Sequence, residues 1–413
     1  MPNLHSGLTT RQHIAPPGED LICFSHLRWN FVYQRPQHLL SRCARDRRVL
    51  FFEEPVRDDI RDPRIQVTRD ASGVIIAVPH VPAAFGHDEE IFAVRALLDA
   101  FIASERMQPR ILWYYTPMAL AFSDHLQAWR IVYDCMDELS AFAGAPAGLR
   151  RAEQALLARA HVVFTGGVSL FEAKRHLHPN MHACPSSVDV AHFARARQAA
   201  AEPPDQAALG RPRLGFYGVL DERFDVELVR QAAARRPDWQ FVMIGPTVKI
   251  DPAVLPRAAN IHYLGTRAYD ALPGYLAGWD VALLPFARND ATRFISPTKT
   301  PEYLAAGCPV VSTSIRDVVR PYGELGLARI ADDPDAFVAA AEAALGEDPA
   351  ARRRAADALL AGMSWDETWR SMWAQVRAAG KDTLPCSITS LSGRASQAPS
   401  SPNGWQPAQA KRY

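Results

Sequence analysis

The stretch FISPTKTPEYLAAGCPVVST, residues 294–313, has the pattern of a polar loop, a short helix, a glycine and a buried strand. Pro301 lies near the first helical turn, where the missing N–H of proline costs no hydrogen bond. The amides of Thr298, Lys299 and Thr300 would then be free to donate to an anion at the positive end of the helix dipole. Lys299 adds a full positive charge, so the stretch predicts an anion-binding loop beside a parallel strand.

Glu302 lies one turn into the same predicted helix. A carboxylate there cannot favour a phosphate directly, but it suits two adjacent hydroxyls such as those of a ribose. A glutamate is also a common charge at the start of a helix, where it complements the helix dipole. The residues alone leave both interpretations of Glu302 open.

Short apolar runs alternate with helical patterns on both sides of this stretch. In the first half, strands are expected at 21–25, 49–53, 74–79, 111–115, 131–134 and 162–165. In the second half, they are expected at 214–218, 241–245, 261–265, 281–285 and 309–313. Apolar strands separated by helices are typical of βαβ units, and so many strands fit two sheets better than one. The predicted fold class is α/β: two Rossmann-like, doubly wound domains facing each other across a cleft, with a C-terminal helix and a disordered tail.

Breaks in this pattern predict the domain organisation. Residues 194–212 are rich in Ala, Gln and Pro without a strong period, and residues 363–379 combine a capping-box start with an aromatic stripe that is expected to pack. The expected parts are a flexible N-terminus at 1–19, a Rossmann-like domain at 20–195, a linker at 196–211, a second Rossmann-like domain at 212–362, a packing helix at 363–379 and a disordered tail at 380–413.

Composition and missing motifs exclude several classes of function. The formal net charge of +1 gives no global attraction to nucleic acid. Neither a G-x-G-x-x-G nor a P-loop motif is present, and His176, His178 and His182 lack the spacing of a metal site, so no cofactor and no metal are expected. The six cysteines form no C-x-x-C pair, and no signal peptide or apolar run of about 18 residues is present, which predicts a cytoplasmic protein.

The pattern SPTK-x-x-EYLAAG-x-PVVST resembles the donor-binding motif of the retaining family-4 glycosyltransferases, which have two Rossmann-like domains in the GT-B architecture. Weaker matches are WNFVYQRPQHLL, VYDCMDE and YLGTRAYDALPGYLAGWDVALLPF, so the resemblance spans roughly residues 20–380. It implies that the first domain binds the acceptor and the second binds the donor. It also implies that Glu302 binds the donor ribose and that loop amides at Ser296 and Thr298 contact phosphate and sugar.

The sequence departs from the family pattern at three positions. Phe294 stands where the family often has a glutamate, eight residues before Glu302. Val219 and Phe224 stand where the family usually has an arginine and a lysine. Neither of these two side chains can pair with a diphosphate, so other groups must supply that charge.

Other donor-side candidates follow the strands of the second domain. Arg223 and Lys299 are the nearest substitutes for the missing cations, and a solvated surface charge is the alternative for both. Gly218 ends the first strand of this domain, at the edge where parallel sheets bind ligands. Arg267 follows another strand and could lie against the nucleotide base or phosphate.

Two aspartates, Asp134 and Asp137, follow a buried strand of the first domain, where the resemblance places a histidine or an acidic residue beside the donor sugar. A carboxylate there could stabilise oxocarbenium character or accept a proton from the acceptor hydroxyl. A cap or turn role is the alternative. The acceptor-side candidates are His26, Arg28, Trp29 and Arg35.

The segment from Gln34 to Arg48 carries five arginines against one acid, Asp46. A basic patch at Arg35–Arg48 could hold an anionic membrane surface at about 1 kcal/mol per charge. A solvated helix end is the alternative. Peripheral contact with the inner face of the membrane therefore stays open beside the cytoplasmic location.

Together these features predict a retaining hexosyltransferase whose donor is a nucleoside-diphosphate sugar. A UDP-linked donor is expected before a GDP-linked one, and no metal is expected to take part. The expected acceptor is a hydroxyl of a polysaccharide or a lipid-linked intermediate. Two alternatives stay open. One is a sugar-nucleotide epimerase on the same architecture, and the other is a nucleotide-sugar-binding protein that has lost catalysis through the changes at Phe294 and Val219.

Overall fold

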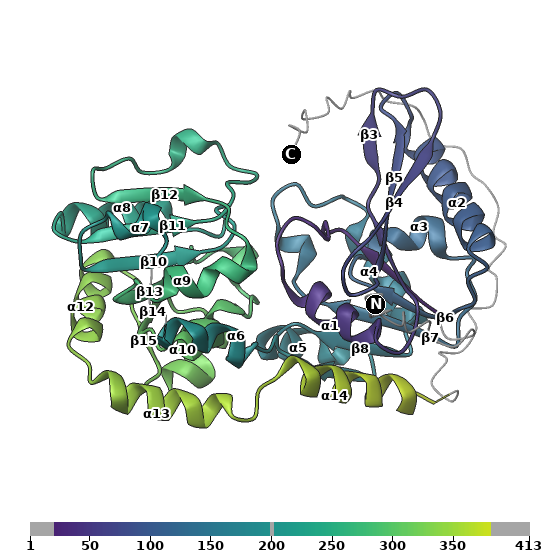
Figure 1. The fold of residues 1–413 in the computed structure, drawn as a ribbon. Coiled ribbons are helices and arrows are strands. Elements are labelled where there is room, and N and C mark those ends of the chain that lie inside the picture. The colour runs from purple at the N-terminus through teal and green to yellow at the C-terminus, as the bar shows by residue number, and fades with distance from the viewer. Residues whose placement is uncertain (1–19, 199–201, 381–413) are drawn as a thin grey trace, which may run out of the picture.

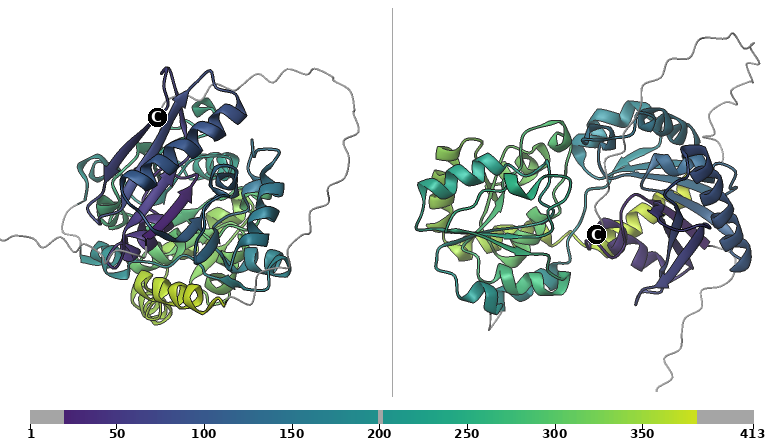
Figure 2. Two further views of the ribbon diagram at one scale, coloured as in Figure 1. Left: turned by 90° about the vertical axis from the view of Figure 1, so that its right-hand side faces the viewer. Right: turned by 90° about the horizontal axis from the view of Figure 1, so that it is seen from above.

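The computed structural model describes residues 20–198 and 202–380, which form two α/β domains side by side (Figure 1). The predicted flexible segment 1–19 and, apart from Gly380, the predicted tail lie outside these residues, as do residues 199–201 of the predicted linker. Each domain has a mostly parallel sheet with helices on both faces (Figure 2), so the predicted fold class is confirmed.

The first domain holds a nine-stranded sheet. Its strands are β1 (Asp20–Ser25), β2 (Val49–Glu53), β3 (Val56–Asp58), β4 (Arg64–Arg69), β5 (Ile75–Pro82), β6 (Pro109–Tyr114), β7 (Arg130–Cys135), β8 (Val162–Thr165) and β9 (Met181–Ala183). They lie in the order β3-β5-β2-β1-β6-β7-β8-β9, with β4 antiparallel to β5. The central strands are buried along their whole length because helices cover both faces. These helices include α1 (Arg35–Cys43), α2 (His87–Ser104), α3 (Leu120–Ser123), α4 (Leu149–Arg159) and α5 (Val168–Lys174).

The second domain holds a fully parallel, six-stranded sheet. Its strands are β10 (Arg213–Tyr217), β11 (Gln240–Ile244), β12 (Ile261–Gly265), β13 (Val281–Leu284), β14 (Val310–Ser312) and β15 (Ala328–Ile330). They lie in the order β12-β11-β10-β13-β14-β15, so the order reverses beside β10, where doubly wound sheets bind ligands. Its helices are α6 (Val190–Ala194), α7 (Pro204–Ala207), α8 (Val226–Arg235), α9 (Leu272–Leu276), α10 (Lys299–Ala306), α11 (Arg316–Val318), α12 (Pro334–Leu345) and α13 (Pro349–Leu360).

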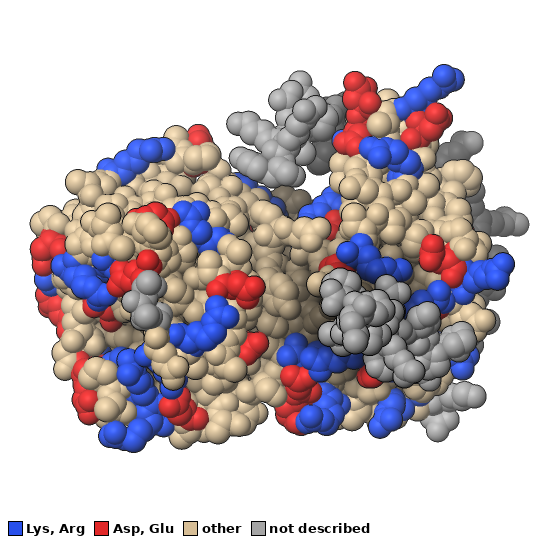
Figure 3. Space-filling view, viewed as in Figure 1, with Lys and Arg blue, Asp and Glu red and all other residues tan. Residues whose placement is uncertain are grey.

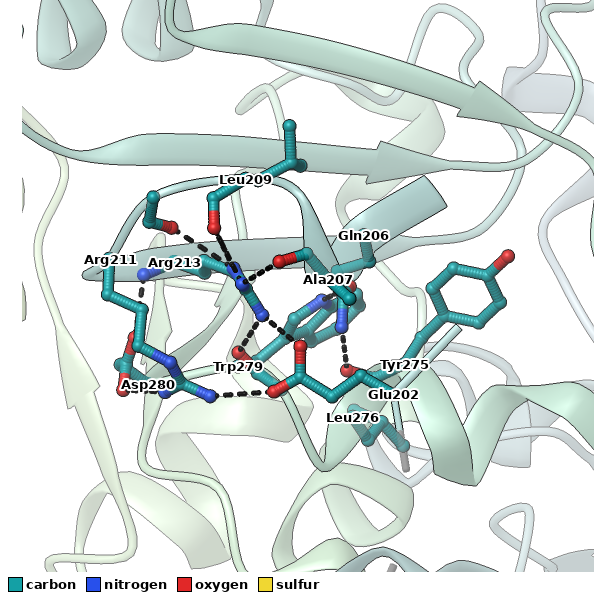
Figure 4. Close-up of polar contacts among 12 residues, drawn as sticks. Glu202, Gln206, Ala207, Leu209, Arg211, Arg213, Tyr275, Leu276, Trp279 and Asp280 are labelled. Carbon is teal, nitrogen blue, oxygen red and sulfur yellow. Dashed lines mark hydrogen bonds and ion pairs between the residues drawn. The ribbon is translucent and has the colours of Figure 1, made fainter. Parts of the chain in front are cut away.

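The segment predicted as a linker is attached to the second domain. Val188 and Phe193 already lie in the core of that domain, so the chain leaves the first domain before the predicted boundary at residue 195. Farther on, Arg213 pairs with Glu202 and donates to the Leu209 carbonyl over 2.6 Å (Figure 4). The physical reason is that this Ala- and Pro-rich stretch supplies polar groups that satisfy a buried arginine.

The last helix, α14 (Trp365–Ala378), packs on the first domain although it follows α13 of the second (Figure 1). Ser364 caps it by accepting from the Glu367 amide over 3.0 Å, as the capping-box pattern predicts. The predicted stripe faces the core of the first domain, with Trp365, Met372 and Val376 at most 1% exposed. The expected C-terminal packing helix is confirmed.

A chain that ends at residue 362 should therefore have a less stable first domain. Burying each of Trp365, Met372 and Val376 contributes about 1.5–3 kcal/mol, so several kcal/mol are lost together. Thermal unfolding followed by circular dichroism measures the effect, with a chain that ends at residue 380 as the control because it keeps α14. An unchanged first transition in the shorter chain would contradict the packing role.

Candidate functional site

A cavity of about 1120 Å³ lies between the two domains, at the carboxyl ends of both sheets. Figure 3 shows the surface hollowed between the two bodies. The loops after β1 and β7 line it from the first domain, and the loops after β10, β11 and β12 and the start of α10 line it from the second. The structure therefore brings together most of the residues that the sequence singles out as site candidates.

Glu302 lies on the second-domain wall of this cavity with only 6% of its surface exposed. The Tyr217 hydroxyl donates to Glu302 Oε2 and fixes the orientation of the carboxylate. Burial raises the pKa of Glu302 to about 7, although the hydrogen bond from Tyr217 and the charge of Lys299 act in the opposite direction. Among the described residues no hydrogen bond reaches the other oxygen of this carboxylate, so the buried, oriented group is suited to accept hydrogen bonds from two neighbouring hydroxyls.

The loop before α10 forms the adjoining part of the wall. Ser296, Thr298 and Lys299 all line the cavity, and Gly218 lies opposite Lys299 at the end of β10. Gly218 has φ +147°, a conformation that other residues rarely adopt, and a Cβ there would also displace the end of the Lys299 side chain. Burial lowers the pKa of Lys299, and the Arg223 charge acts in the same direction.

Two arginines predicted on the donor side line the cavity with their guanidinium groups already paired. Arg223 Nε donates to both Asp221 oxygens, at 3.0 and 3.1 Å. Arg267 donates to Asp205 over 2.6 Å and to the Tyr275 hydroxyl over 2.6 Å. Each guanidinium keeps further N–H groups for a ligand, but its charge is partly balanced within the domain.

The two aspartates after β7 are separated by the structure. Asp137 lines the cavity, and within the described ranges its carboxylate has no hydrogen-bond or ion-pair partner. Burial raises the pKa of Asp137, which the charges of Arg223 and Lys299 partly counteract. Asp137 is therefore the available carboxylate of the pair.

Asp134 does not line the cavity, which corrects the prediction that it faces the donor sugar. Its carboxylate is completely buried and accepts from Arg35 Nε at 3.1 Å to each oxygen. Arg35 also donates to the Cys184 carbonyl over 2.7 Å. Arg35 touches the cavity but is 1% exposed, so its charge is used to hold α1 against β7 rather than offered to an acceptor.

The acceptor-side candidates divide in the same way. His26 and Trp29 line the cavity, and burial together with the Lys249 charge lowers the pKa of His26 to about 4, so the ring is neutral near pH 7. Arg28 lies outside the lining, which corrects its expected place, because it donates to Glu53 over 2.9 Å and to the Glu54 carbonyl over 2.6 Å.

Two of the three positions that depart from the family pattern pack in or against a domain core. Phe294 lies outside the cavity and packs against the core of the first domain. Phe224 lies in the core of the second domain, 5.3 Å from the Phe216 ring centre. Val219 lines the cavity without a charge. The residue that supplies a further cation is Lys249, which follows β11 and lines the cavity without an ion-pair partner in the described part of the chain.

Sequence reasoning missed Lys249, Tyr217 and Tyr269 as site residues. Lys249 has φ +62°, a conformation that is uncommon for residues other than glycine and concentrates at functional sites. The feature of the sequence that could have indicated Lys249 is its position a few residues after a predicted strand of the second domain. Tyr217 sits inside an apolar run and looks like a core residue until its contact with Glu302 is seen.

The predicted membrane patch is occupied by contacts within the protein. Arg42 and Arg45 both pair with Asp366 of α14, at 2.9 and 2.8 Å, and Arg48 pairs with Asp20 at 2.6 Å. Arg42 and Arg45 therefore hold the last helix on the first domain, and Arg48 holds the start of the central strand β1, so these charges are partly balanced within the protein. No helix in the described ranges is both long and apolar enough to span a membrane.

Two sets of hydrogen bonds join the domains. Asp317 of α11 accepts from the Val168 and Ser169 amides of α5, at 2.9 and 3.0 Å. The Ala143 amide donates to both carboxylate oxygens of Glu222 at 3.1 Å. Ligands bound in the cavity would therefore be enclosed by both domains.

Comparisons with known proteins agree with this architecture. Residues 211–347 match the model of the family described as glycosyl transferases group 1. Over 294 residues, the chain is 26% identical to TuaH of Bacillus subtilis (strain 168), a protein named for a glycosyltransferase role in teichuronic acid biosynthesis. That match covers 64% of this chain and 72% of TuaH.

Solved structures share the two-domain fold. The sucrose-phosphate synthase of Thermosynechococcus elongatus superposes with a TM-score of 0.67 at 15% identity, covering 88% of this chain and 100% of that one. Anabaena Alr3699/HepE in complex with UDP superposes with a TM-score of 0.60 at 13% identity, covering 87% and 100%. The chain therefore has the two-domain GT-B fold, and its second domain, at residues 211–347, matches the group 1 glycosyltransferase family.

Proposed function

We propose that the protein transfers a hexose from a nucleoside-diphosphate sugar to a hydroxyl of a saccharide acceptor, with retention of configuration. UDP is the first candidate for the nucleotide of the donor, and GDP is the second. The observation that carries this proposal is the buried Glu302 carboxylate, fixed by Tyr217 in the cavity between the domains. It stands beside Lys299 and the 296–298 loop, so a ribose and a diphosphate can be bound side by side on the second domain.

The charges of the cavity support a donor diphosphate. Lys299, Lys249 and Arg223 all line it from the second domain, and Arg223 and Lys249 both lie over the Phe142 ring of the first domain, at 5.5 and 6.0 Å. Cationic side chains near a diphosphate neutralise the charge that develops on the leaving group. We propose that these groups do so without a metal, although the family's usual arginine and lysine are replaced by Val219 and Phe224.

Asp137 is the carboxylate that we propose for the reacting sugar. It faces the cavity from the first domain and is held near the Arg223 and Lys299 charges. From that side it would stabilise positive charge at the anomeric carbon or accept the proton of the acceptor hydroxyl. The proposed retention rests on the family-4 resemblance of the SPTK-x-x-EYLAAG motif.

We propose an acceptor in polysaccharide biosynthesis, a class supported by the name of TuaH. Its hydroxyl would approach from the first-domain side, past His26 and Trp29. A lipid-linked saccharide is the other form that the acceptor could take. The arginines of α1 and the segment after it are paired, so they give no support to membrane contact.

A thermal-shift screen against UDP, GDP and their hexose conjugates tests the proposal directly. A ligand present at 100 times its dissociation constant should add about 2.7 kcal/mol to the stability. The shift should persist in EDTA, because side-chain cations hold the diphosphate. A shift that requires magnesium or manganese would overturn the metal-free part, and no shift with any nucleotide would overturn the function. Analysis of products from the donor alone and from donor with acceptor separates transfer from epimerisation and from binding without turnover.

A further inference from the structure

A cluster of aromatic rings joins the two domains beside the cavity. Tyr269, which follows β12, packs against Tyr33 and His38 of the first domain, with ring centres 4.7 and 5.6 Å apart. On the other side its ring stacks on His192, with centres 4.3 Å apart and planes 11° apart. Tyr269 and Tyr33 both line the cavity. The Tyr269 ring is therefore fixed in place by both domains at once.

The hydroxyl of Tyr269 is unpaired within the described part of the chain. Its oxygen is buried, and no hydrogen bond to it is formed by the residues that the structure describes. A buried phenol usually finds a partner, and leaving it without one costs about 1–3 kcal/mol. The fixed ring gives the hydroxyl little freedom to turn elsewhere, so a bound ligand is the natural source of the missing hydrogen bond.

The surroundings of this hydroxyl identify the kind of ligand. Phe193 packs against Tyr269 on one side, with ring centres 5.6 Å apart, and against Tyr217 on the other, at 6.4 Å. Tyr217 is the residue that donates to Glu302. Burial raises the pKa of Tyr269, and the charge of Glu302 raises it further. Tyr269 therefore stands as a neutral donor on the same side of the cavity as the Glu302 carboxylate.

We propose that Tyr269 is a donor-binding residue whose hydroxyl bonds the ribose of the nucleotide, next to the hydroxyls that Glu302 accepts. This inference rests on the proposed function and extends it to a residue outside the SPTK-x-x-EYLAAG motif. Because Tyr33 and His38 hold the ring from the first domain, the bond forms with full strength only when the two domains are in contact. Tyr269 thus couples nucleotide binding to domain closure.

The test compares UDP binding to the full-length wild type and to Tyr269→Phe by isothermal titration calorimetry, with GDP in parallel. The variant keeps the ring and its packing and loses only the hydroxyl. One neutral hydrogen bond of 0.5–1.5 kcal/mol corresponds to a roughly 2-fold to 12-fold loss of affinity. The donor KM should rise by a similar factor while kcat stays nearly constant, because ribose is bound equally in the ground and transition states. Tyr263→Phe is the matched control, because its hydroxyl donates to the Pro256 carbonyl over 3.1 Å and Tyr263 is not among the residues that line the cavity.

Deoxynucleotides and a second variant make the test specific. The loss in Tyr269→Phe should shrink for 2′-deoxy-UDP or 3′-deoxy-UDP, whichever lacks the partner oxygen. It should also shrink in a Tyr33→Ala background, since the ring is then held from one domain only. Equal losses for all three nucleotides, or wild-type affinity in Tyr269→Phe while Glu302→Gln weakens binding, would overturn this inference alone. Wild-type affinity in both variants would overturn the proposed function as well.

Discussion

The Glu302→Gln variant should bind UDP roughly 30-fold to 1000-fold more weakly than the wild type, a loss of about 2–4 kcal/mol. Each hydrogen bond to a charged group contributes about 1.5–3 kcal/mol, and the amide retains only part of that. The fold should persist, because glutamate and glutamine have similar helix propensities. Calorimetric titration with UDP and with the sugar nucleotide should show the same loss, since ribose belongs to both.

Two comparisons separate ribose recognition from a structural effect of Glu302. The loss should be smaller for 2′-deoxy-UDP, which already lacks one hydroxyl. It should also shrink below pH 7, because the pKa of Glu302 is raised to about 7 by burial and the protonated acid resembles the amide. The raised pKa means that the folded protein loses stability as the pH rises through 7. The neutral variant should therefore be at least as stable as the wild type at pH 8. An equal loss of affinity for UDP and for 2′-deoxy-UDP in the Glu302→Gln variant would contradict the proposed role of Glu302 in ribose binding.

The Asp134→Asn variant should lose about 3–5 kcal/mol of stability, because it leaves the Arg35 charge buried without its partner. The Arg35 and Asp134 side chains are 1% and 0% exposed, so water cannot replace the lost contact. Thermal unfolding of the full chain should show this as a lower first transition. Since two domains need not unfold together, the transition should be assigned to the first domain by hydrogen exchange of the amides of β7, the strand that carries Asp134.

Two further variants show whether burial causes the effect. The exposed pair of Arg95 and Asp124 has side chains that are 39% and 51% exposed, and Asp124→Asn should cost only about 0–1 kcal/mol. Replacing both members of the buried pair, as Arg35→Met with Asp134→Leu, should restore much of the stability. A double variant that is stable and still transfers sugar would confirm that Asp134 positions the fold. A double variant that folds but no longer transfers sugar would show that Asp134 takes part in the reaction.

The pattern of apolar and polar residues predicted the strands that are buried on both faces of a sheet. The run VLFFE at 49–53 was expected as a strand and is β2, because a strand buried on both faces must be apolar throughout. The antiparallel β4 was missed, since it is mostly exposed and its RIQVTR sequence has little apolar signal. The three-residue strands β9 and β15 are too short to carry a period, and pairing with a neighbouring strand creates them.

The site shows the same division between local and distant information. The motif at 296–302 marks its own helix start, so Glu302, Lys299 and the loop could be located from sequence. Asp134 and Asp137 are three residues apart and look equivalent along the chain. Only the tertiary fold shows that Arg35, 99 residues away, pairs with one of them and leaves the other in the cavity. Lys249 and Tyr269 likewise line a cavity that exists only because the two domains face each other.

The path of the last helix has a consequence for how the protein is made. The first domain is discontinuous, because its core includes α14, whereas the described residues from Val188 to Leu360 that lie in a core belong to the second domain. The ribosome therefore releases every residue of the second domain before the first can be completed. Until α14 emerges, Arg42 and Arg45 lack Asp366, and the surface that receives Trp365 stays uncovered. Emergence of α14, rather than synthesis of either sheet, is therefore the event that completes the core of the first domain.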